Sequence, residues 1–252
     1  MILTVVIPTF NEAGNVPRLA EALFALPIPD LRILFVDDNS PDGTAQTVRE
    51  LDGRYPGRVS LHLRPKKMGL GSAYVTGFRI AIENGAEAIA QMDADFSHPP
   101  EKLVELASAM ESFDLAIGSR YVEGGSLDER WPLWRRSLSA FGNIYARTIL
   151  HLTIRDVTGG FRVWHRRALE GLPLDGIRSS GYVFQVELAY LAERLDYRVK
   201  EIPIHFADRR WGKSKMSLRI QMEAAMRVWW VRFAYRDLKP GGIASPYPGR
   251  GL

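Results

Sequence analysis

The chain has 252 residues, of which 46% are hydrophobic, 25% are charged and none is Cys. This length predicts one large domain, or one domain with an appendage, and allows a sizeable buried core. The composition is ordinary for a soluble globular protein, which excludes a disordered chain, collagen and a simple coiled coil. The lack of Cys excludes a disulfide scaffold, an iron–sulfur protein, a Cys zinc site and a Cys nucleophile.

Signals for membrane insertion are missing from the sequence. No stretch of about 18 or more uncharged apolar residues occurs, so no transmembrane helix is expected. Residues 1–8 have neither a basic segment nor a small-residue cleavage site, so they are predicted to form a first strand rather than a signal peptide.

Charge is unevenly distributed along the chain, although the net charge at pH 7 is only +4. Residues 1–119 carry 10 Lys or Arg and 16 Asp or Glu, whereas residues 120–252 carry 23 and 13. The basic second half indicates an anionic partner: a phosphate, a nucleic acid or an anionic membrane surface. Of the 33 basic residues 26 are Arg, whose guanidinium favours bidentate recognition of phosphate.

The first half alternates short apolar runs with segments of helical periodicity. Strand-like runs occupy 3–8, 31–37, 59–63, 88–93 and 114–118. Helical spacing predicts helices over 16–26, 44–51, 71–84 and 100–110. This alternation favours an α/β fold with a mostly parallel sheet and helices on both faces, which binds ligands at the carboxyl ends of its strands.

The second half is less regular. Helices are predicted over 133–152, 183–195 and 217–238, and a strand over 199–206. Residues 156–161 are predicted to form a loop because they include two adjacent glycines. Residues 241–252 are rich in Gly and Pro and are expected to be disordered.

Polar residues follow three of the predicted strands. Glu12 follows the first, Asp37 and Asp38 end the second, and Asp93 and Asp95 close the fourth. Side chains two residues apart in extended chain project to the same side, so the last pair could grip one Mg²⁺ or Mn²⁺. A metal there would neutralise charge on a departing diphosphate. The other acidic residues could accept hydrogen bonds from ribose hydroxyls or base nitrogens.

Structural interpretations of these residues stay open. The Asp-x-Asp pair also suits a solvated turn or helix cap, and Ser40 or Asp42 could cap the following helix. An EF-hand loop from Asp93 is excluded, because positions 98 and 104 are His and Val rather than Gly and Glu. Residues 66–71 match neither a P-loop nor the dinucleotide glycine fingerprint, so a flexible turn is the simpler interpretation.

Basic residues gather after the fifth predicted strand. Arg120 follows that strand and is expected near the metal in a parallel sheet. Arg135 and Arg136 form a second set, and segment 208–215 combines Arg and Lys with Gly and Ser, which suits a mobile loop that closes on phosphate. A solvated basic face is the alternative interpretation. The lone histidines at 98 and 205 are expected to be structural.

The predicted helix over 217–238 has a broad apolar arc with Arg residues on or beside it. A membrane-interface helix tolerates this pattern, since Arg reaches headgroups while Trp lies at the boundary. The alternative is a helix packed on its own domain with exposed Arg tips. The apolar members are Leu218, Met222, Met226, Trp229, Trp230 and Phe233, and the basic ones are Arg219, Arg232 and Arg236.

Seven sequence blocks, in order, resemble the family 2 glycosyltransferases of the inverting, metal-dependent type. The resemblance covers about residues 2–238 and is strongest to the group that transfers mannose to polyprenyl (dolichyl) phosphate. Seven blocks in the family order are far more specific than Asp-x-Asp alone. The blocks are Val5–Glu12, Val36–Thr44, Met92–Pro99, Gly118–Tyr121, Asp156–Arg162, Gly181–Gln185 and Asp208–Lys215.

The resemblance implies a GT-A, Rossmann-like nucleotide-diphospho-sugar transferase fold. It implies a catalytic domain over 1–216, an amphipathic membrane-interface helix over 217–240 and a disordered tail over 241–252. Several relatives differ at two site positions: position 97 is Ser here where some have Gln, so a water could replace a ligand, and position 10 is Phe where Tyr is frequent.

Site roles also follow from the resemblance. The nucleotide sugar would be surrounded by Pro8, Phe10, Glu12, Val36 and Asp38, with Ala94 close to the diphosphate. Asp93, Asp95 and Ser97 would hold Mg²⁺ or Mn²⁺. Arg120, Arg209 and Lys215 would contact donor diphosphate or acceptor phosphate and, with Asp95, support catalysis. Arg135, Arg136 and Ser139 would receive the lipid phosphate.

The implied reaction transfers mannose from GDP-mannose to polyprenyl phosphate with inversion, releasing GDP. Peripheral attachment at the cytoplasmic face of a membrane is expected, through the basic second half and helix 217–238 or through a small membrane protein. One alternative is transfer of glucose or an N-acetylhexosamine from a UDP-sugar. Another is a non-catalytic phosphate- or nucleic-acid-binding protein, which leaves the acidic strand ends unexplained and lacks RNA-binding signatures, so no nucleic acid is expected.

Overall fold

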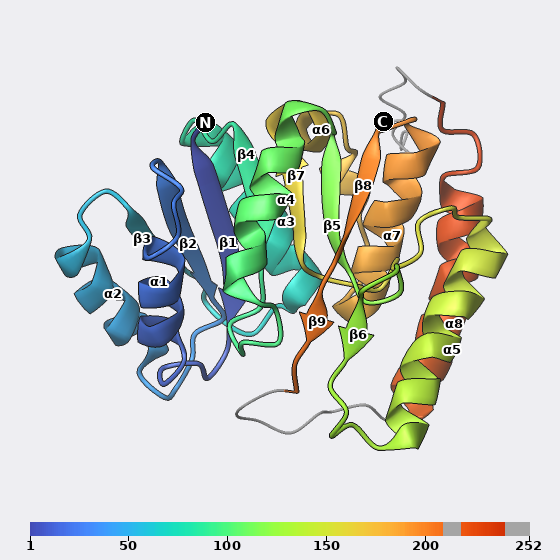
Figure 1. The fold of residues 1–252 in the computed structure, drawn as a ribbon, viewed down its shortest axis with the longest axis horizontal. Helices are drawn as coiled ribbons and strands as arrows, with labels where there is room; N and C mark the ends of the chain where they lie inside the picture. The colour runs from blue at the N-terminus through green and yellow to red at the C-terminus, as the bar shows by residue number, and fades with distance from the viewer. Residues whose placement is uncertain (209–217, 240–252) are drawn as a thin grey trace, which may run out of the picture.

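A seven-stranded sheet organises the chain, in the order β3–β2–β1–β4–β7–β5–β8 (Figure 1). The structure is a computed structural model that describes residues 1–208 and 218–239. Neighbouring strands are parallel except at β7, which is antiparallel to both β4 and β5. The strands are β1 (Leu3–Thr9), β2 (Leu31–Asp37), β3 (Val59–Leu63), β4 (Ala88–Gln91), β5 (Leu115–Ser119), β7 (Arg162–His165) and β8 (Val199–Pro203).

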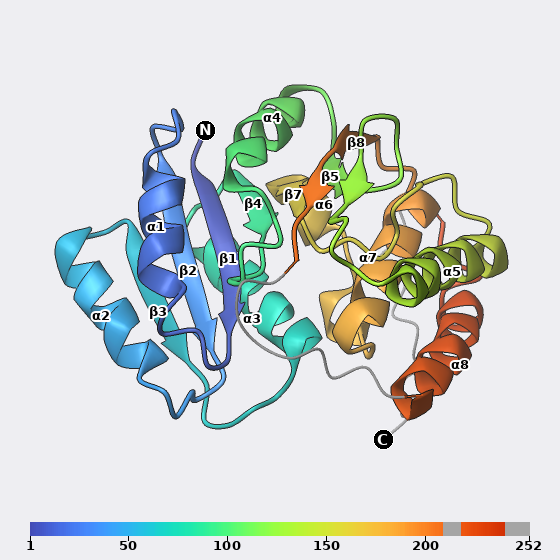
Figure 2. The same cartoon turned by 60° about the horizontal axis from the view of Figure 1, so that its bottom comes forward.

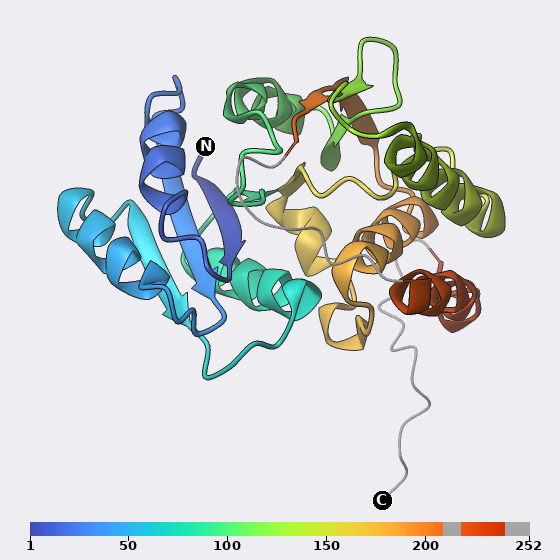
Figure 3. The same cartoon turned by 90° about the horizontal axis from the view of Figure 1, so that it is seen from below.

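Helices cover both faces of this sheet, as the sequence predicts (Figure 3). One core packs α1 (Val16–Phe24), α2 (Thr44–Arg54) and α4 (Leu103–Ser108) against the sheet, and the other packs α3 (Leu70–Glu83) and α7 (Gly181–Arg194). Alternate side chains of β1 pack into the two cores: Val5 and Ile7 into the first, and Val6 into the second. Burial on both faces explains why the strands read as continuous apolar runs.

Short elements complete the fold. Predicted helix 100–110 is α4 flanked by two 3₁₀ turns, η1 (Pro100–Lys102) and η2 (Ala109–Glu111). The predicted strand 199–206 is divided into β8 and β9 (His205–Phe206), because the chain leaves β5 after Pro203 and pairs next with β6 (Ser126–Leu127). The remaining short helices are α6 (Arg166–Glu170) and η3 (Leu174–Gly176).

The sequence does not predict β7, which directly follows the loop expected at 156–161. The strand has only four residues, Arg-Val-Trp-His, and this is too short to show a period of two. Its first side chain, Arg162, is charged yet fully buried. Since β7 lies between β4 and β5, it brings the loop before it to the carboxyl ends of both neighbours.

Two long helices lie side by side at one edge of the molecule, α5 (Leu133–Leu150) and α8 (Leu218–Ala234) (Figures 1 and 2). The buried side of α8 packs on its own domain through Val228 and Val231, and the Tyr235 hydroxyl that follows donates to Glu187 at 2.7 Å. The predicted arc is therefore divided, because Trp230 packs inward toward Tyr235 while Met226, Trp229 and Phe233 stay exposed. No described helix is long and apolar enough to cross a membrane. The expected tail at 241–252 lies outside the described residues.

Candidate active site

The carboxyl ends of the parallel strands meet at one edge of the sheet, the lower edge in Figure 1. Asp38 leaves β2 there and forms a buried ion pair with Arg64, which leaves β3. The other oxygen of Asp38 accepts from the backbone N–H groups of Met68 and Gly69 at 3.1 and 3.2 Å. The Arg64 guanidinium also donates to Ser72 Oγ at 2.7 Å. These contacts fix the loop that leads into α3.

The residues expected around the nucleotide lie on adjacent strands. Pro8 of β1 is paired with Val36 of β2, whose side chain is buried in the core beside α3. Phe10 carries the Lys67 ammonium 3.9 Å above its ring centroid. Glu12 accepts a hydrogen bond from the Asn15 amide at 2.7 Å. The structure thus brings these expected residues together at the ends of β1 and β2.

The acidic pair after β4 is held by two hydroxyl groups. Asp93 Oδ1 accepts from the Tyr74 hydroxyl at 3.1 Å, and Tyr74 is fully buried with its ring stacked on Phe184. Burial and the adjacent Asp93 raise the pKa of Tyr74 well above its ordinary value, so the hydroxyl stays a donor. Asp95 Oδ1 accepts from Ser97 Oγ at 2.6 Å and from Ser97 N at 3.1 Å. Both carboxylates are therefore oriented before any ligand binds.

The chemistry of this donor set fits a hard divalent cation. Asp93, Asp95 and Ser97 offer carboxylate and hydroxyl oxygens, the ligands that Mg²⁺ and Mn²⁺ prefer. Within the part of the chain that the structure describes, no group of three His, Cys, Asp or Glu side chains is placed to hold a metal. Water or phosphate oxygens would have to complete the coordination shell, as is common for Mg²⁺.

His98 connects the acidic pair to the basic side of the site. Its Nδ1 accepts from the backbone N–H of Asp93 at 3.1 Å, and its ring stacks on Phe161 with centroids 5.1 Å apart. Burial lowers the pKa of His98, and the nearby Arg120 acts in the same direction. The ring is therefore neutral at neutral pH, as an acceptor Nδ1 requires. His98 also meets the edge of Phe206, over which the Arg120 guanidinium lies.

Arg120 forms a buried, bidentate ion pair with Asp156, the first residue of the loop before β7. Its Nε and Nη2 each donate at 2.7 Å to one carboxylate oxygen, and Nη2 also donates to Thr158 Oγ1. Burial alone would raise the pKa of Asp156, but Arg120 outweighs it and holds the pKa below its ordinary value. Arg162, also fully buried, has its pKa lowered to about 10 by burial, although Asp156 favours its charged form.

The residues expected to receive the lipid phosphate start α5. The Arg135 guanidinium lies 3.6 Å from the Trp131 ring centroid and donates to Asp208 at 3.1 Å. The hydroxyl of Ser139 is 3.0 Å from that of Tyr121, the neighbour of Arg120. Arg136 is half-buried on the same first turns of α5. The expected residues Arg209 and Lys215 lie outside the described residues.

Three side chains at this site have no role in the predictions from sequence. Arg64 is a polar residue that follows a strand, the same signal that identified Asp38, and it could have been found in that way. Asp156 lies in a block that resembles the family, yet its pairing with Arg120 depends on the position of β7. Tyr74 reads as an ordinary core residue of a helix, and only the fold brings its hydroxyl to Asp93.

The geometry defines an α/β protein of GT-A-like fold with an acidic pair and a cationic cluster at one sheet edge. A solved mannosyltransferase from Pyrobaculum calidifontis, in complex with GDP-Man and Mn²⁺, has a similar fold with a TM-score of 0.62. The match covers 97% of this chain and 66% of that one, at 18% sequence identity, so it shows the fold alone.

The chain belongs to glycosyl transferase family 2, whose family model matches residues 4–172. It is 42% identical over 231 residues to the polyprenol monophosphomannose synthase of Mycolicibacterium smegmatis, covering 90% of this chain and 86% of that protein. It is 41% identical over 232 residues to the undecaprenyl-phosphate mannosyltransferase of Micrococcus luteus, covering 90% and 93%. The family expected from the seven blocks is confirmed.

Removing the charge of Asp156 should destabilise the protein. Asp156→Asn leaves the buried Arg120 without its counter-charge, and we expect the free energy of unfolding to fall by about 3 kcal/mol at pH 7. The pKa of Asp156 is lowered in the folded state, so its stabilisation is present above pH 3.8, its ordinary pKa, and is lost as the pH falls further. Urea denaturation at pH 7 and at about pH 3 measures both effects.

The matched control is Asp175→Asn, because Asp175 pairs with Arg79 while its side chain is 96% exposed. That change should cost less than about 1 kcal/mol. Equal losses in the two variants at pH 7 would contradict a stabilising buried pair.

Proposed function

We propose that this chain transfers mannose from GDP-mannose to the phosphate of a polyprenyl phosphate, giving polyprenyl-phosphate mannose and GDP. The names of the two relatives at 42% and 41% identity support the acceptor and the sugar. The observation that carries the proposal is the single edge on which the acidic pair and the cationic cluster meet, connected through His98 and Phe206. A donor diphosphate and an acceptor phosphate need these two kinds of surface side by side.

The donor half of the site is built around Asp93 and Asp95. We infer that they hold Mg²⁺ or Mn²⁺ with help from Ser97, and the solved relative with Mn²⁺ supports this choice. When bound, the cation neutralises the charge that develops on the departing diphosphate. The carboxylates are pre-oriented by Tyr74 and Ser97, so little reorganisation is needed on binding.

The acceptor half supplies positive charge in fixed positions. The ion pair with Asp156 engages Nε and Nη2 of Arg120, which leaves its Nη1 edge to meet a phosphate oxygen. Arg135 and Arg136 approach from α5, and we infer that Arg209 and Lys215 close on the same anions. The acceptor phosphate is already anionic near neutral pH, so it needs little help from a general base. The task of the protein is to position two anions that repel one another.

Attack from the sugar face opposite the diphosphate would invert the anomeric centre. A series of contacts runs from the backbone of Asp93 through His98 and Phe206 to Trp131, just before α5, and this series joins the donor half to the acceptor half. Water exclusion by Trp131 and Phe206, whose rings meet edge to face at 5.8 Å, strengthens the electrostatic interactions between them.

We further propose that the outer face of α5 and α8 docks on a membrane surface. Both helices expose large apolar side chains there, and a hydrogen bond of 3.0 Å joins Trp229 Nε1 to the Tyr145 hydroxyl across the pair. Exposed apolar surface of this kind marks an interaction site. A small membrane protein is a second possible attachment. This apolar face consists of Leu133, Trp134, Phe141 and Ile144 of α5 and Met226, Trp229 and Phe233 of α8.

Mannosyl transfer is tested with labelled GDP-mannose and polyprenyl phosphate in detergent, by counting label in the organic phase. We expect transfer with Mg²⁺ or Mn²⁺, none with EDTA, and a loss of at least about 100-fold in Asp95→Asn. Asp52→Asn, a change on the exposed surface of α2, should leave the rate unchanged. Transfer from a UDP-sugar but not from GDP-mannose would show that the proposed donor is wrong. Transfer that is insensitive to EDTA would contradict the proposed requirement for a divalent cation.

Docking by the apolar face is tested by vesicle co-sedimentation. Phe233→Glu, at a position 59% exposed, should weaken binding at least tenfold because it replaces apolar contact with a charge that resists desolvation. Leu63→Glu changes an exposed residue of β3, away from α5 and α8, and should bind as the unmodified protein does. Equal binding by both variants, with unchanged thermal stability, would rule out this face.

A further inference from the structure

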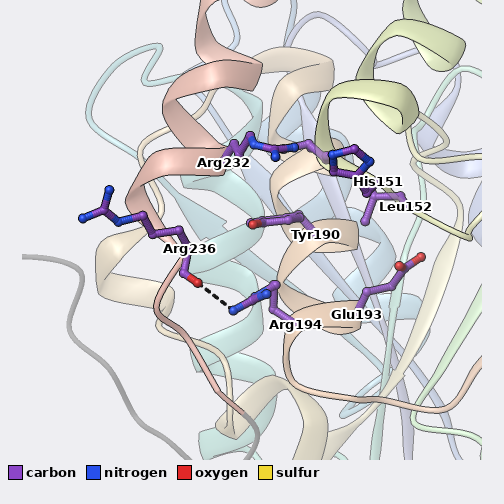
Figure 4. A pocket seen from close by; sticks show the side chains of 8 residues that line it. His151, Leu152, Tyr190, Glu193, Arg194, Arg232 and Arg236 are labelled. Atoms are coloured by element: carbon purple, nitrogen blue, oxygen red, sulfur yellow. Dashed lines mark hydrogen bonds between the residues drawn. The ribbon is translucent and has the colours of Figure 1, made fainter.

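A pocket of about 390 Å³ opens between the C-terminal ends of α5, α7 and α8 (Figure 4). Its inner surface is apolar, formed by the buried Leu150, Leu152 and Tyr190. Basic side chains dominate the rest of the lining. These are His151, Arg194, Arg232 and Arg236, and Glu193 is the single acidic residue among those that line it.

Two of the arginines, Arg194 and Arg232, are held in place by backbone carbonyl oxygens near the helix ends. Arg194 Nη2 donates to the carbonyl oxygens of residues 236 and 238 at 2.7 and 2.6 Å, and Arg232 Nη1 donates to that of Ile149. A guanidinium has five N–H donors, so each retains donors for a ligand. In the described part of the chain, Arg194 Nε is buried without a hydrogen-bond partner.

Negative charge inside the pocket is already engaged. Glu193 Oε1 accepts from the backbone N–H groups of Thr153 and Ile154, each at 2.8 Å. Asp237 is paired with the exposed Arg236 at 3.2 Å. Figure 4 shows Arg232 reaching toward His151 while the Arg236 side chain extends outward from the rim. With three arginines against one glutamate, the lining carries an excess of positive charge over an apolar base.

This pocket is separate from the acceptor site at the start of α5. Ser139 and His151 are twelve residues apart, and a rise of 1.5 Å per residue places them about 18 Å apart along the helix. The pocket instead continues the apolar face. His151 directly follows Leu150, the last residue of α5, and Arg236 lies two residues beyond Ala234, the last residue of α8, so the pocket lies at the ends of the two helices that carry the apolar face.

We propose that this pocket binds the phosphate of an anionic phospholipid headgroup at the membrane on which α5 and α8 lie. The proposal rests on the docking proposed above, because the apolar face would place acyl chains beside it. Arg194 and Arg232 bind phosphate oxygens through their remaining donors, the exposed Arg236 adds a headgroup contact from the rim, and Tyr190 with Leu152 contacts the glycerol part. Basic groups at such a position gain affinity from the negative surface potential of the lipid.

The test compares binding to phosphatidylcholine vesicles with binding to vesicles that also contain phosphatidylglycerol. The unmodified protein should prefer the anionic vesicles at least tenfold. Arg236→Gln should lower that preference about fivefold, and Arg232→Gln/Arg236→Gln should lower it further, because each removes about one headgroup contact. Binding to phosphatidylcholine alone should not change, since the apolar face is intact.

Arg227→Gln is the matched control, an arginine of α8 that does not line the pocket. Any positive charge near an anionic surface adds some attraction. If the pocket binds a headgroup, Arg236→Gln should therefore lower the preference for anionic vesicles more than Arg227→Gln does. Equal losses of preference in the two variants would mean that the arginines act only through non-specific attraction to the anionic surface, and this would overturn the proposal. Arg236 is exposed, so its replacement should preserve folding, which thermal melting checks.

A soluble phosphate is the other source of the same chemistry. Glycerol 3-phosphate could raise the melting temperature of the unmodified protein but not that of Arg232→Gln/Arg236→Gln, while the two proteins show the same preference for anionic vesicles. In that case the ligand is soluble and the lipid proposal fails.

The mannosyl transfer assay in detergent separates the two proposals. Arg236→Gln should transfer at the unmodified rate, and a chain that lacks transfer yet keeps its pocket-dependent lipid preference would contradict only the proposed function.

Discussion

The buried pair of Arg120 and Asp156 is the interaction on which the site depends. It joins the end of β5 to the loop before β7, and this loop can reach β5 only because β7 runs antiparallel between β4 and β5. Burying either charge without the other would be strongly unfavourable, so each of the two groups stabilises the other in the folded protein. The pair holds Arg120 over Phe206 and near Tyr121, whose hydroxyl meets Ser139 of α5. One contact thus aligns the sheet with the acceptor helix.

The distribution of charge in the sequence has a counterpart in space. The acidic first half contributes the Asp93–Asp95 pair at the end of β4, and the basic second half contributes Arg120 and the arginines of α5. Neutral aromatic groups, His98 and Phe206, separate the two. An enzyme that joins two anionic substrates needs positive charge near each of them to offset their mutual repulsion. The chain's membership of glycosyl transferase family 2 agrees with such a reaction.

The parallel strands and the covering helices could be predicted because apolar runs and helical periodicity are local properties. The strand-end acids were found for the same reason, since they directly follow those runs. The four-residue β7 could not, because its place depends on pairing with β4 and β5 and not on its own pattern. Tyr74 illustrates the general limit: its hydroxyl reaches Asp93 from a helix 19 residues earlier in the chain. The division of the α8 arc likewise depends on which face meets α7.

The central claim is that the carboxylates after β4 bind a nucleoside diphosphate through a divalent cation. Titration calorimetry of GDP into the protein, with Mn²⁺ or with EDTA, tests this without acceptor, membrane or turnover. The account predicts GDP binding that requires Mn²⁺, is lost in Asp95→Asn and is at least tenfold tighter than the binding of UDP. Equal affinity for GDP in EDTA, or in Asp95→Asn, would contradict it.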